Sequence, residues 1–326
     1  MTLAALGWNE TWKEKFGRQK LEALKPEGLV PGRVVGEHRT HFQVATGEAE
    51  VSAELTGRLR NAASLRSDLP GVGDYVALRL SIGDGPASIE AVLPRATELI
   101  RKAAGETRPQ LIAANVDTIF IVTGLDGDFN IQRIQRYVAL VRSGRSEPVI
   151  VVNKVDLSKD VAGAIAQIEA VEPGITIHAI SARDKASAAV LEAYFDGGKT
   201  IALIGSSGVG KSTLTNALLG RDAQATQEVR SYDSRGRHTT THRQLFMRAQ
   251  GGTLIDTPGM RGLELWTETA VEQPNFEDIE ALALRCKFRN CIHQSEPGCA
   301  VLAAIAHGDM EAGHLAAYAK AGGGRH

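Results

Sequence analysis

The segment Gly205-Ser-Ser-Gly-Val-Gly-Lys-Ser212 lies between an apolar run at 200–205 and a predicted helix at 211–219. It matches the pattern G-x-x-x-x-G-K-[ST] of a phosphate-binding loop, in the strand–loop–helix context that such a loop needs. Its glycines let the backbone wrap round a phosphate, and the helix N-terminus adds a favourable dipole. Lys211 is expected to reach the β- and γ-phosphates as a catalytic group, and Ser212 to bind Mg²⁺. The full set expected to hold the nucleotide phosphates is Gly205, Ser206, Ser207, Gly208, Val209, Gly210, Lys211, Ser212 and Thr213.

On both sides of this loop, apolar runs alternate with helical patterns. The expected strands are 116–122, 148–154, 175–181, 200–205 and 253–256, and the expected helices are 131–143, 159–171, 187–195 and 211–219. Continuous apolar strands separated by helices predict a parallel sheet that is covered on both faces. Ligands of such sheets bind at the carboxyl ends of the strands, where the motifs described next are found.

The run TLIDTPG at 253–259 ends a predicted strand with Asp256. A carboxylate at a strand end suits Mg²⁺, directly or through a water, and Gly259 suits a backbone N–H directed at a γ-phosphate. Alone, DTPG is a common turn. After a phosphate-binding loop it supports a nucleoside triphosphate site.

The tetrapeptide Asn153-Lys-Val-Asp156 ends another predicted strand, and Ser181-Ala182 follows the next one. The Asp156 carboxylate can accept hydrogen bonds from N1–H and the exocyclic amine of guanine, a donor pair that adenine lacks. The aliphatic stem of Lys154 can cover the base plane. Ser181 and Ala182 could present a backbone N–H to guanine O6. Each motif is weak alone, but their placement on successive strand ends predicts a guanine site.

Residues 29–95 have a different pattern, with about five short alternating strands broken by glycine turns. They predict a small all-β barrel, for which the OB-fold is the five-stranded candidate. The expected domains are a lead-in helix at 1–28, an OB-fold β-barrel at 29–96, an α/β domain at 97–271 and a helical metal-binding domain at 272–326. In the lead-in, an apolar stripe favours a helix packed on its own domain over one that binds a partner. The stripe consists of Leu6, Trp8, Trp12 and Phe16.

All three cysteines of the chain lie close together, in the arrangement Cys286-x₄-Cys291-x-His293-x₅-Cys299. Three thiolates and one imidazole make a complete tetrahedral ligand set for a structural Zn²⁺, with no position left for a catalytic water. Basic side chains surround the cluster, and Phe288 could stack on a base. Residues 272–326 contain more acidic than basic side chains, so any RNA-binding patch there must be local.

Together these motifs form the guanine-nucleotide set of the GTPases, but in the order NKVD, SA, phosphate loop, threonine and DTPG. Ordinary GTPases begin with the phosphate loop, so the order indicates a circular permutation. With a small barrel in front and a Cys/His cluster behind, residues 29–310 resemble the RsgA (YjeQ) family of GTPases that depend on the small ribosomal subunit. The segment Gly236-Arg-His-Thr-Thr-Thr-His242 resembles the switch of that family.

The resemblance implies GTP and GDP as ligands, Mg²⁺ and one structural Zn²⁺ as cofactors, and the small ribosomal subunit with its rRNA as partner. It implies GTP hydrolysis in late maturation of that subunit, as a binding and release checkpoint. Thr240, with Thr239 as second choice, is expected to reach Mg²⁺ and the γ-phosphate. Arg235, Arg237 and Arg243 make this loop basic, which suits either phosphate contacts or a solvated loop.

Met260 occupies the position after DTPG where many GTPases have a glutamine that orients the attacking water. Methionine cannot do so, and turnover by the isolated protein is therefore expected to be slow. His238 and His242 are the candidate catalytic groups, because a neutral imidazole can orient or deprotonate water near pH 7. They could equally contact RNA or be solvated. Met260 also keeps open an RNA-binding assembly scaffold in which GTP only switches conformation.

Composition and charge exclude several classes of protein. The chain has 326 residues, 43% hydrophobic and 23% charged, and its 37 basic and 38 acidic residues give a net charge of −1. A strongly basic nucleic-acid binder is therefore excluded. There is no apolar run long enough for a membrane span and no secretory signal pattern, so a cytoplasmic protein is expected. The clustered cysteines exclude a disulfide framework, and a monomer is the working assumption.

Overall fold

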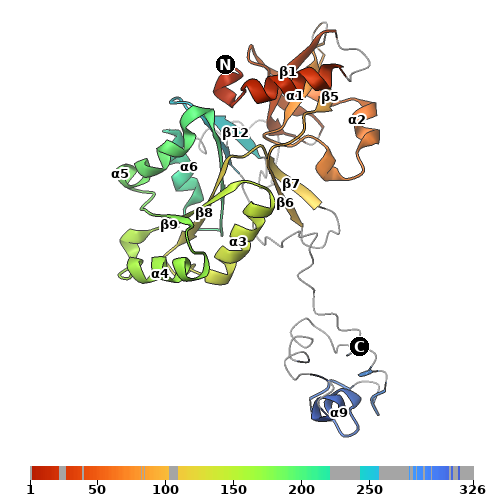
Figure 1. Cartoon of the computed structure of the whole chain (residues 1–326), viewed down its shortest axis with the longest axis vertical. Helices are drawn as coiled ribbons and strands as arrows, with labels where there is room; N and C mark the ends of the chain where they lie inside the picture. The colour runs from red at the N-terminus through yellow and green to blue at the C-terminus, as the bar shows by residue number, and fades with distance from the viewer. Residues whose placement is uncertain are drawn as a thin grey trace, which may run out of the picture. The chain divides into compact units, whose positions relative to one another are not determined.

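The computed structural model contains two compact units, Met1–Trp266 and Thr267–His326 (Figure 1). In the first unit the structure describes residues 2–21, 27–38, 40–81, 83, 85–102, 109–220 and 243–256. In the second it describes 279, 282–283, 285–288, 291–294, 296–307, 310 and 315. None of the helices formed by these residues is long and apolar enough to cross a membrane.

The α/β part of the first unit has the order β10-β9-β8-β11-β13-β12. Its strands are β8 (Thr118–Gly124), β9 (Glu147–Asn153), β10 (Thr176–Ala179), β11 (Thr200–Ile204), β12 (Gln244–Met247) and β13 (Thr253–Asp256). Alternate residues of β8 enter two different apolar clusters, Ile119 and Ile121 one and Phe120 and Val122 the other. The prediction of a sheet covered on both faces is therefore confirmed.

The helices of this part are α3 (Ile131–Ser143), α4 (Val161–Val171), α5 (Lys185–Ala188), the 3₁₀ segment η4 (Ala189–Gly198) and α6 (Lys211–Leu219). Polar side chains fix two helix starts: the Asn130 side chain accepts from Arg133 N–H, and that of Asp160 from Gly163 N–H. The prediction of a single helix at 187–195 is wrong. The structure instead has the short helix α5, which is followed directly by the 3₁₀ segment η4. That segment is interrupted at Asp196 and Gly197, where the backbone leaves helical angles.

Two strand pairings were not predicted from the sequence. β12 runs antiparallel to β13, so the sheet is not wholly parallel. The hairpin of β6 (Glu98–Lys102) and β7 (Pro109–Ala114) was also not predicted. Strands as short as these carry too few apolar residues to form a distinct periodic pattern.

The preceding residues form the predicted five-stranded OB-fold barrel. Its strands are β1 (Leu29–Glu37), β2 (Phe42–Ala45), β3 (Glu50–Leu55), β4 (Tyr75–Arg79) and β5 (Ala87–Val92), with α2 (Gly57–Ala62) and the 3₁₀ turn η2 (Arg66–Asp68) between β3 and β4. The order β1-β2-β3-β5-β4 closes because β1 also pairs with β4. Gly32 is needed inside the barrel, since a Cβ there would lie 2.6 Å from Cγ1 of Val44. Val34, Val44, Val76 and Ile89 are among its fully buried core residues.

The lead-in packs on the barrel, as the stripe of apolar residues predicted. Only Trp12 and Phe16 lie on the helix α1 (Glu10–Leu21), because Leu6 ends a separate 3₁₀ turn, η1 (Ala4–Leu6), and Trp8 lies between them. The Trp12 ring lies 4.2 Å from that of Tyr75, centroid to centroid. The lead-in is therefore part of the barrel's own packing.

Arg33 joins three parts of the first unit through one fully buried guanidinium. It donates to the carbonyls of Leu6 in the lead-in and Gly73 in the barrel, and at the α/β sheet to the Asn115 carbonyl and the Thr200 hydroxyl. The guanidinium also lies 4.7 Å from the centre of the Tyr75 ring. Because its partners are neutral oxygens, these hydrogen bonds replace the hydration that burial removes.

Replacing Arg33 by Met is expected to lower the free energy of unfolding of the first unit by about 3 kcal/mol, since buried carbonyls lose their donors. Urea unfolding followed by the fluorescence of Trp8 and Trp12 measures this change. Arg142→Met is the control, because Arg142 forms an exposed ion pair with Glu172 and should cost less than about 1 kcal/mol. Equal unfolding midpoints for wild type and Arg33→Met would contradict this role.

The second unit is organised round α9 (Ala300–His307) and the cysteine cluster. Ile279, Cys291, Cys299 and Val301 form its buried apolar core. Its described residues agree with the helical character predicted for 272–326.

Candidate functional site

The phosphate-binding loop connects the end of β11 to the start of α6, as its sequence predicted. Gly205, Gly208 and Gly210 have φ values of 147°, 86° and 98°, which side-chain-bearing residues rarely adopt. A Cβ would lie 2.2 Å from the Val122 carbonyl oxygen at Gly205 and 2.3 Å from Asn153 Nδ2 at Gly210. The glycines are thus required by both backbone angle and space, and the cradle fits a phosphate group.

Lys211 begins α6 and folds its side chain back over this loop. Its Nζ donates to the Gly205 carbonyl at 2.8 Å and also to the Ser206 carbonyl. Burial lowers the pKa of the Lys211 ammonium, and the carboxylates of Asp256 and Asp128 oppose this shift. The ammonium therefore lies at the cradle, where phosphate oxygens would compete for its hydrogen bonds.

Asn153 joins the phosphate loop to the loop after β10. It is 2% exposed; its Nδ2 donates to the Val209 carbonyl at 2.7 Å, and its Oδ1 accepts from Ala182 N–H at 2.8 Å. One amide side chain thus connects three of the four predicted motifs. Its contacts are structural, so Asn153 shapes the base site by holding two loops in place.

A cavity of about 210 Å³ lies where these loops meet. It is lined by Asn153, Lys154, Asp156, Leu157, Ser181, Ala182, Arg183, Gly208, Gly210 and Thr213. The structure therefore brings together the motifs predicted to bind the base. The Asp156 carboxylate is exposed in this cavity, so it can accept the hydrogen bonds that guanine donates.

Lys154 lines this cavity, and the end of its side chain is held by two contacts. Its Nζ pairs with the Asp126 carboxylate and donates to the Gly208 carbonyl at 2.6 Å. The hydrogen bond from Lys154 holds the pKa of Asp126 below its usual value. Asp126 was missed by the sequence analysis, although its position just after β8 places it at the same edge of the sheet.

The structure describes only some of the other residues that are predicted to bind the triphosphate and Mg²⁺. Asp256 ends β13 and is buried, and Ser212 is exposed in the first turn of α6. Both lie at the carboxyl edge, where oxygen ligands suit Mg²⁺. His238, Thr239, Thr240, His242, Gly259 and Met260 lie outside the described residues. Their assigned roles remain predictions.

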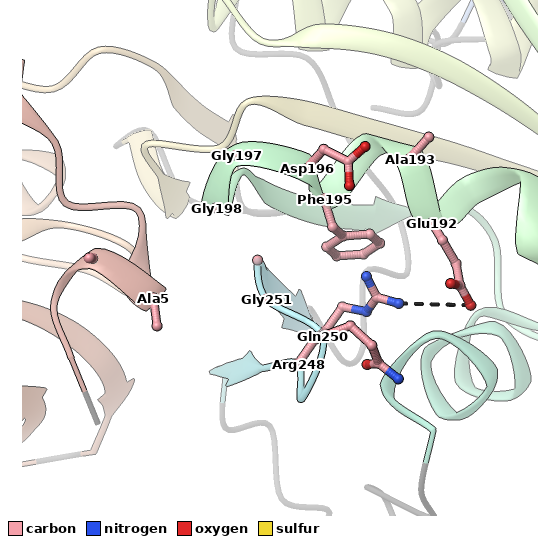
Figure 2. A pocket seen from close by; sticks show the side chains of 12 residues that line it. Ala5, Glu192, Ala193, Phe195, Asp196, Gly197, Gly198, Arg248, Gln250 and Gly251 are labelled. Carbon is pink, nitrogen blue, oxygen red and sulfur yellow. Dashed lines mark ion pairs between the residues drawn. The ribbon is translucent and has the colours of Figure 1, made fainter.

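A larger cavity, of about 450 Å³, lies at the opposite edge, near the starts of β11 and β13 (Figure 2). Arg248 lies in its wall, with its guanidinium 4.1 Å from the centre of the Phe195 ring and near Glu192. Its Nε donates to the Leu218 carbonyl at the end of α6 at 2.8 Å. A cation at a helix C-terminus is favourable, so Arg248 stabilises the helix that begins at the phosphate loop.

The cysteine cluster of the second unit has the dimensions of a zinc site. The ligand atoms of Cys286, Cys291, His293 and Cys299 all lie within 4.8 Å of one another. Cys286 Sγ lies 3.8 Å from Cys299 Sγ, and His293 Nδ1 lies 3.4 Å from that sulfur. A tetrahedron with Zn–S bonds of about 2.3 Å has edges of about 3.8 Å. The four residues therefore fit a structural Zn²⁺.

Burial and neighbouring groups shift the pKa values of two thiols of the cluster in opposite directions. Burial raises the pKa of Cys291 to about 11, and the neighbouring thiols of Cys299 and Cys286 add to this effect. At Cys286 burial also acts to raise the pKa, but backbone donors, Ala300 N–H among them, outweigh it and lower the pKa. His293 has a φ of 58°, an unusual backbone angle for a residue other than glycine. Such an angle is typical of residues held by functional constraints.

Comparison with known proteins gives four consistent findings. The RsgA GTPase family model matches residues 92–266, which is more than half of the chain. A small ribosomal subunit biogenesis GTPase RsgA of Opitutus terrae is 42% identical over 331 residues, covering 98% of this chain and 89% of the relative. The crystal structure of YjeQ from Thermotoga maritima has a TM-score of 0.55 and 27% identity, with 90% of this chain and 96% of that chain covered. YloQ, described as a circularly permuted GTPase, matches in fold with a TM-score of 0.51, 24% identity and coverage of 90% of this chain and 94% of its own.

Proposed function

This chain belongs to the RsgA GTPase family, and we propose that it hydrolyses GTP during biogenesis of the small ribosomal subunit, which stimulates it. We propose further that the protein binds the maturing subunit and its rRNA in the GTP state and leaves after hydrolysis. The observation that carries the proposal is the connection between the nucleotide site and the barrel. β12 pairs with β1 of the barrel on one side and with β13, which ends at Asp256, on the other.

Each part of the site has a role in this reaction. Asp156 accepts hydrogen bonds from guanine, the phosphate loop and Lys211 hold the β- and γ-phosphates, and Ser212 and Asp256 hold Mg²⁺. Mg²⁺, when bound, neutralises charge on the β- and γ-phosphates. Thr240 and the backbone of Gly259 complete the γ-phosphate contacts in this proposal.

The attacking water needs a group that Met260 cannot supply. We assign this role to His238 or His242, since a neutral imidazole accepts a hydrogen bond from water near pH 7. Both histidines belong to the segment that ends directly before Arg243 and β12. Contact with the subunit is proposed to position them, which explains why the isolated protein should turn over slowly.

The checkpoint role predicts that affinity for the small subunit depends on the nucleotide. The protein with a non-hydrolysable GTP analogue should bind small subunits at least about tenfold more tightly than the protein with GDP. Co-sedimentation over a range of subunit concentrations measures the two dissociation constants, with large subunits as the control. Equal affinities in the two nucleotide states would contradict release by hydrolysis. Nucleotide-dependent binding without stimulated hydrolysis would favour an assembly scaffold.

A further inference from the structure

The barrel and the α/β sheet meet at β12, through a single pair of residues. Gln244, the first residue of β12, pairs with Gly36 of β1 on one side and with Asp256 of β13 on the other. One residue therefore stands between the barrel and the carboxylate proposed for Mg²⁺, and Figure 1 shows β12 in cyan at this junction. In the sequence, the predicted switch segment 236–242 directly precedes Arg243.

Arg243 is held by two groups from outside the α/β sheet. Its Nη1 donates to the Leu111 carbonyl of β7 at 3.0 Å and lies 3.7 Å from Oε2 of Glu37, the neighbour of Gly36 in β1. The Arg243 and Glu37 side chains are 16% and 28% exposed, so salt screens their attraction less than that of a surface pair. The barrel thus acts electrostatically on the residue that follows the switch segment.

The Glu37 carboxylate is shared with a second arginine. Its Oε1 lies 4.0 Å from Nη2 of Arg66 in η2, whose side chain is 67% exposed. An RNA phosphate that reaches the barrel surface can bind Arg66 and compete with Glu37 for it. The carboxylate would then act on Arg243 alone.

The ion pair of Arg243 and Glu37 is longer than the hydrogen bonds by which Arg33 joins the barrel to the α/β sheet. Arg33 is fully buried and forms hydrogen bonds of ordinary length, so it fixes the barrel firmly. In contrast, the 3.7 Å between Arg243 and Glu37 exceeds an ordinary hydrogen-bond distance. It can shorten when the surroundings of Glu37 change.

We propose that Glu37 and Arg243 are positioning residues that couple docking of the barrel on its RNA partner to the position of β12 beside Asp256 of β13. This inference rests on the proposed function, because it explains how the small subunit stimulates hydrolysis. It assigns no chemical step to either residue. Their effect is on the arrangement of the groups that do the chemistry.

The test uses Glu37→Gln in the full chain, with Glu90→Gln as the matched control. Glu90 pairs with Arg79 at 3.5 Å within the barrel and is 22% exposed, but it lies on β5, which has no pairing with β12. Glu37→Gln should lower the maximal subunit-stimulated turnover by about tenfold. It should leave GDP affinity, turnover without subunits and the half-saturating subunit concentration within about twofold of wild type. Glu90→Gln should match wild type in all four.

A second variant and a second readout separate positioning from a merely structural contribution. Arg243→Met should lower stimulated turnover as well, and the double variant should be no worse than the more impaired single variant, because the two residues act as a unit. Backbone hydrogen exchange of 243–247, measured without ribosomes, should be faster in Glu37→Gln than in wild type or Glu90→Gln.

Three results would overturn the proposal. They are stimulated turnover of Glu37→Gln equal to that of Glu90→Gln, a defect confined to the half-saturating subunit concentration, and unchanged exchange over 243–247. A wild-type protein that small subunits fail to stimulate would contradict the proposed function itself. The exchange measurement needs no subunits, so the two failures are distinguishable.

Discussion

Replacing Asp156 by Asn is expected to weaken GTP and GDP binding by about 100-fold, or about 2.8 kcal/mol. Guanine presents N1–H and an exocyclic amine to this position, and a carboxylate accepts both. An asparagine amide turns one acceptor into a donor, which opposes the guanine amine and leaves a donor unpaired. Asp156 lies in the wall of the base cavity, which is also lined by the loops that Asn153 holds.

The same substitution should create affinity for xanthine nucleotides, because xanthine has a carbonyl where guanine has the amine. Competition between GDP or xanthosine diphosphate and a fluorescent guanine nucleotide gives both affinities. Asp160→Asn is the control, since Asp160 caps α4 and asparagine caps helices equally well. GDP binding by Asp156→Asn at wild-type strength would show that the cavity is not the guanine site.

Replacing His293 by Ala should abolish stoichiometric zinc binding and unfold the second unit. Structural zinc sites contribute about 10–16 kcal/mol of apparent binding free energy, which here would be folding free energy. The apolar core of this unit is small and includes two of the ligands themselves, Cys291 and Cys299. Elemental analysis of the purified protein should give one zinc per wild-type chain and none for the variant.

His307→Ala is the matched control, because His307 is exposed at the end of α9 and lies outside the cluster. Hydrogen exchange over 300–307 should become fast in His293→Ala, or after treatment of the wild type with a chelator, and stay slow in His307→Ala. GDP affinity should change little, since the nucleotide loops belong to the first unit. Retention of zinc by His293→Ala would remove this histidine from the ligand set.

The parts of the site that the sequence predicted are those encoded by contiguous residues. The loop 205–212 and the tetrapeptide 153–156 specify backbone geometry and chemistry within a few positions, and β11, α6 and β9 place them as expected. The cysteine cluster has short spacings for the same reason. A permuted order of the motifs need not change the sheet, because pairing depends on the strands and not on where the chain begins.

The unpredicted parts depend on pairs of residues far apart in the chain. Asn153 and Val209, Lys154 and Asp126, and the network of Arg33 each join segments that no local pattern connects. The pairing of β1 with β12 is of the same kind, and it merges barrel and α/β sheet into one sheet. Sequence periodicity reports which face of an element is buried, but not against which partner.

Single-turnover GTP hydrolysis by the intact protein with Mg²⁺, measured alone, with small subunits and with large subunits, tests the central claim most directly. We expect slow cleavage by the protein alone, a rise of at least about 100-fold with small subunits and no comparable rise with large subunits. Equal rates under all three conditions, or equal stimulation by both subunits, would contradict a GTPase that the small ribosomal subunit activates.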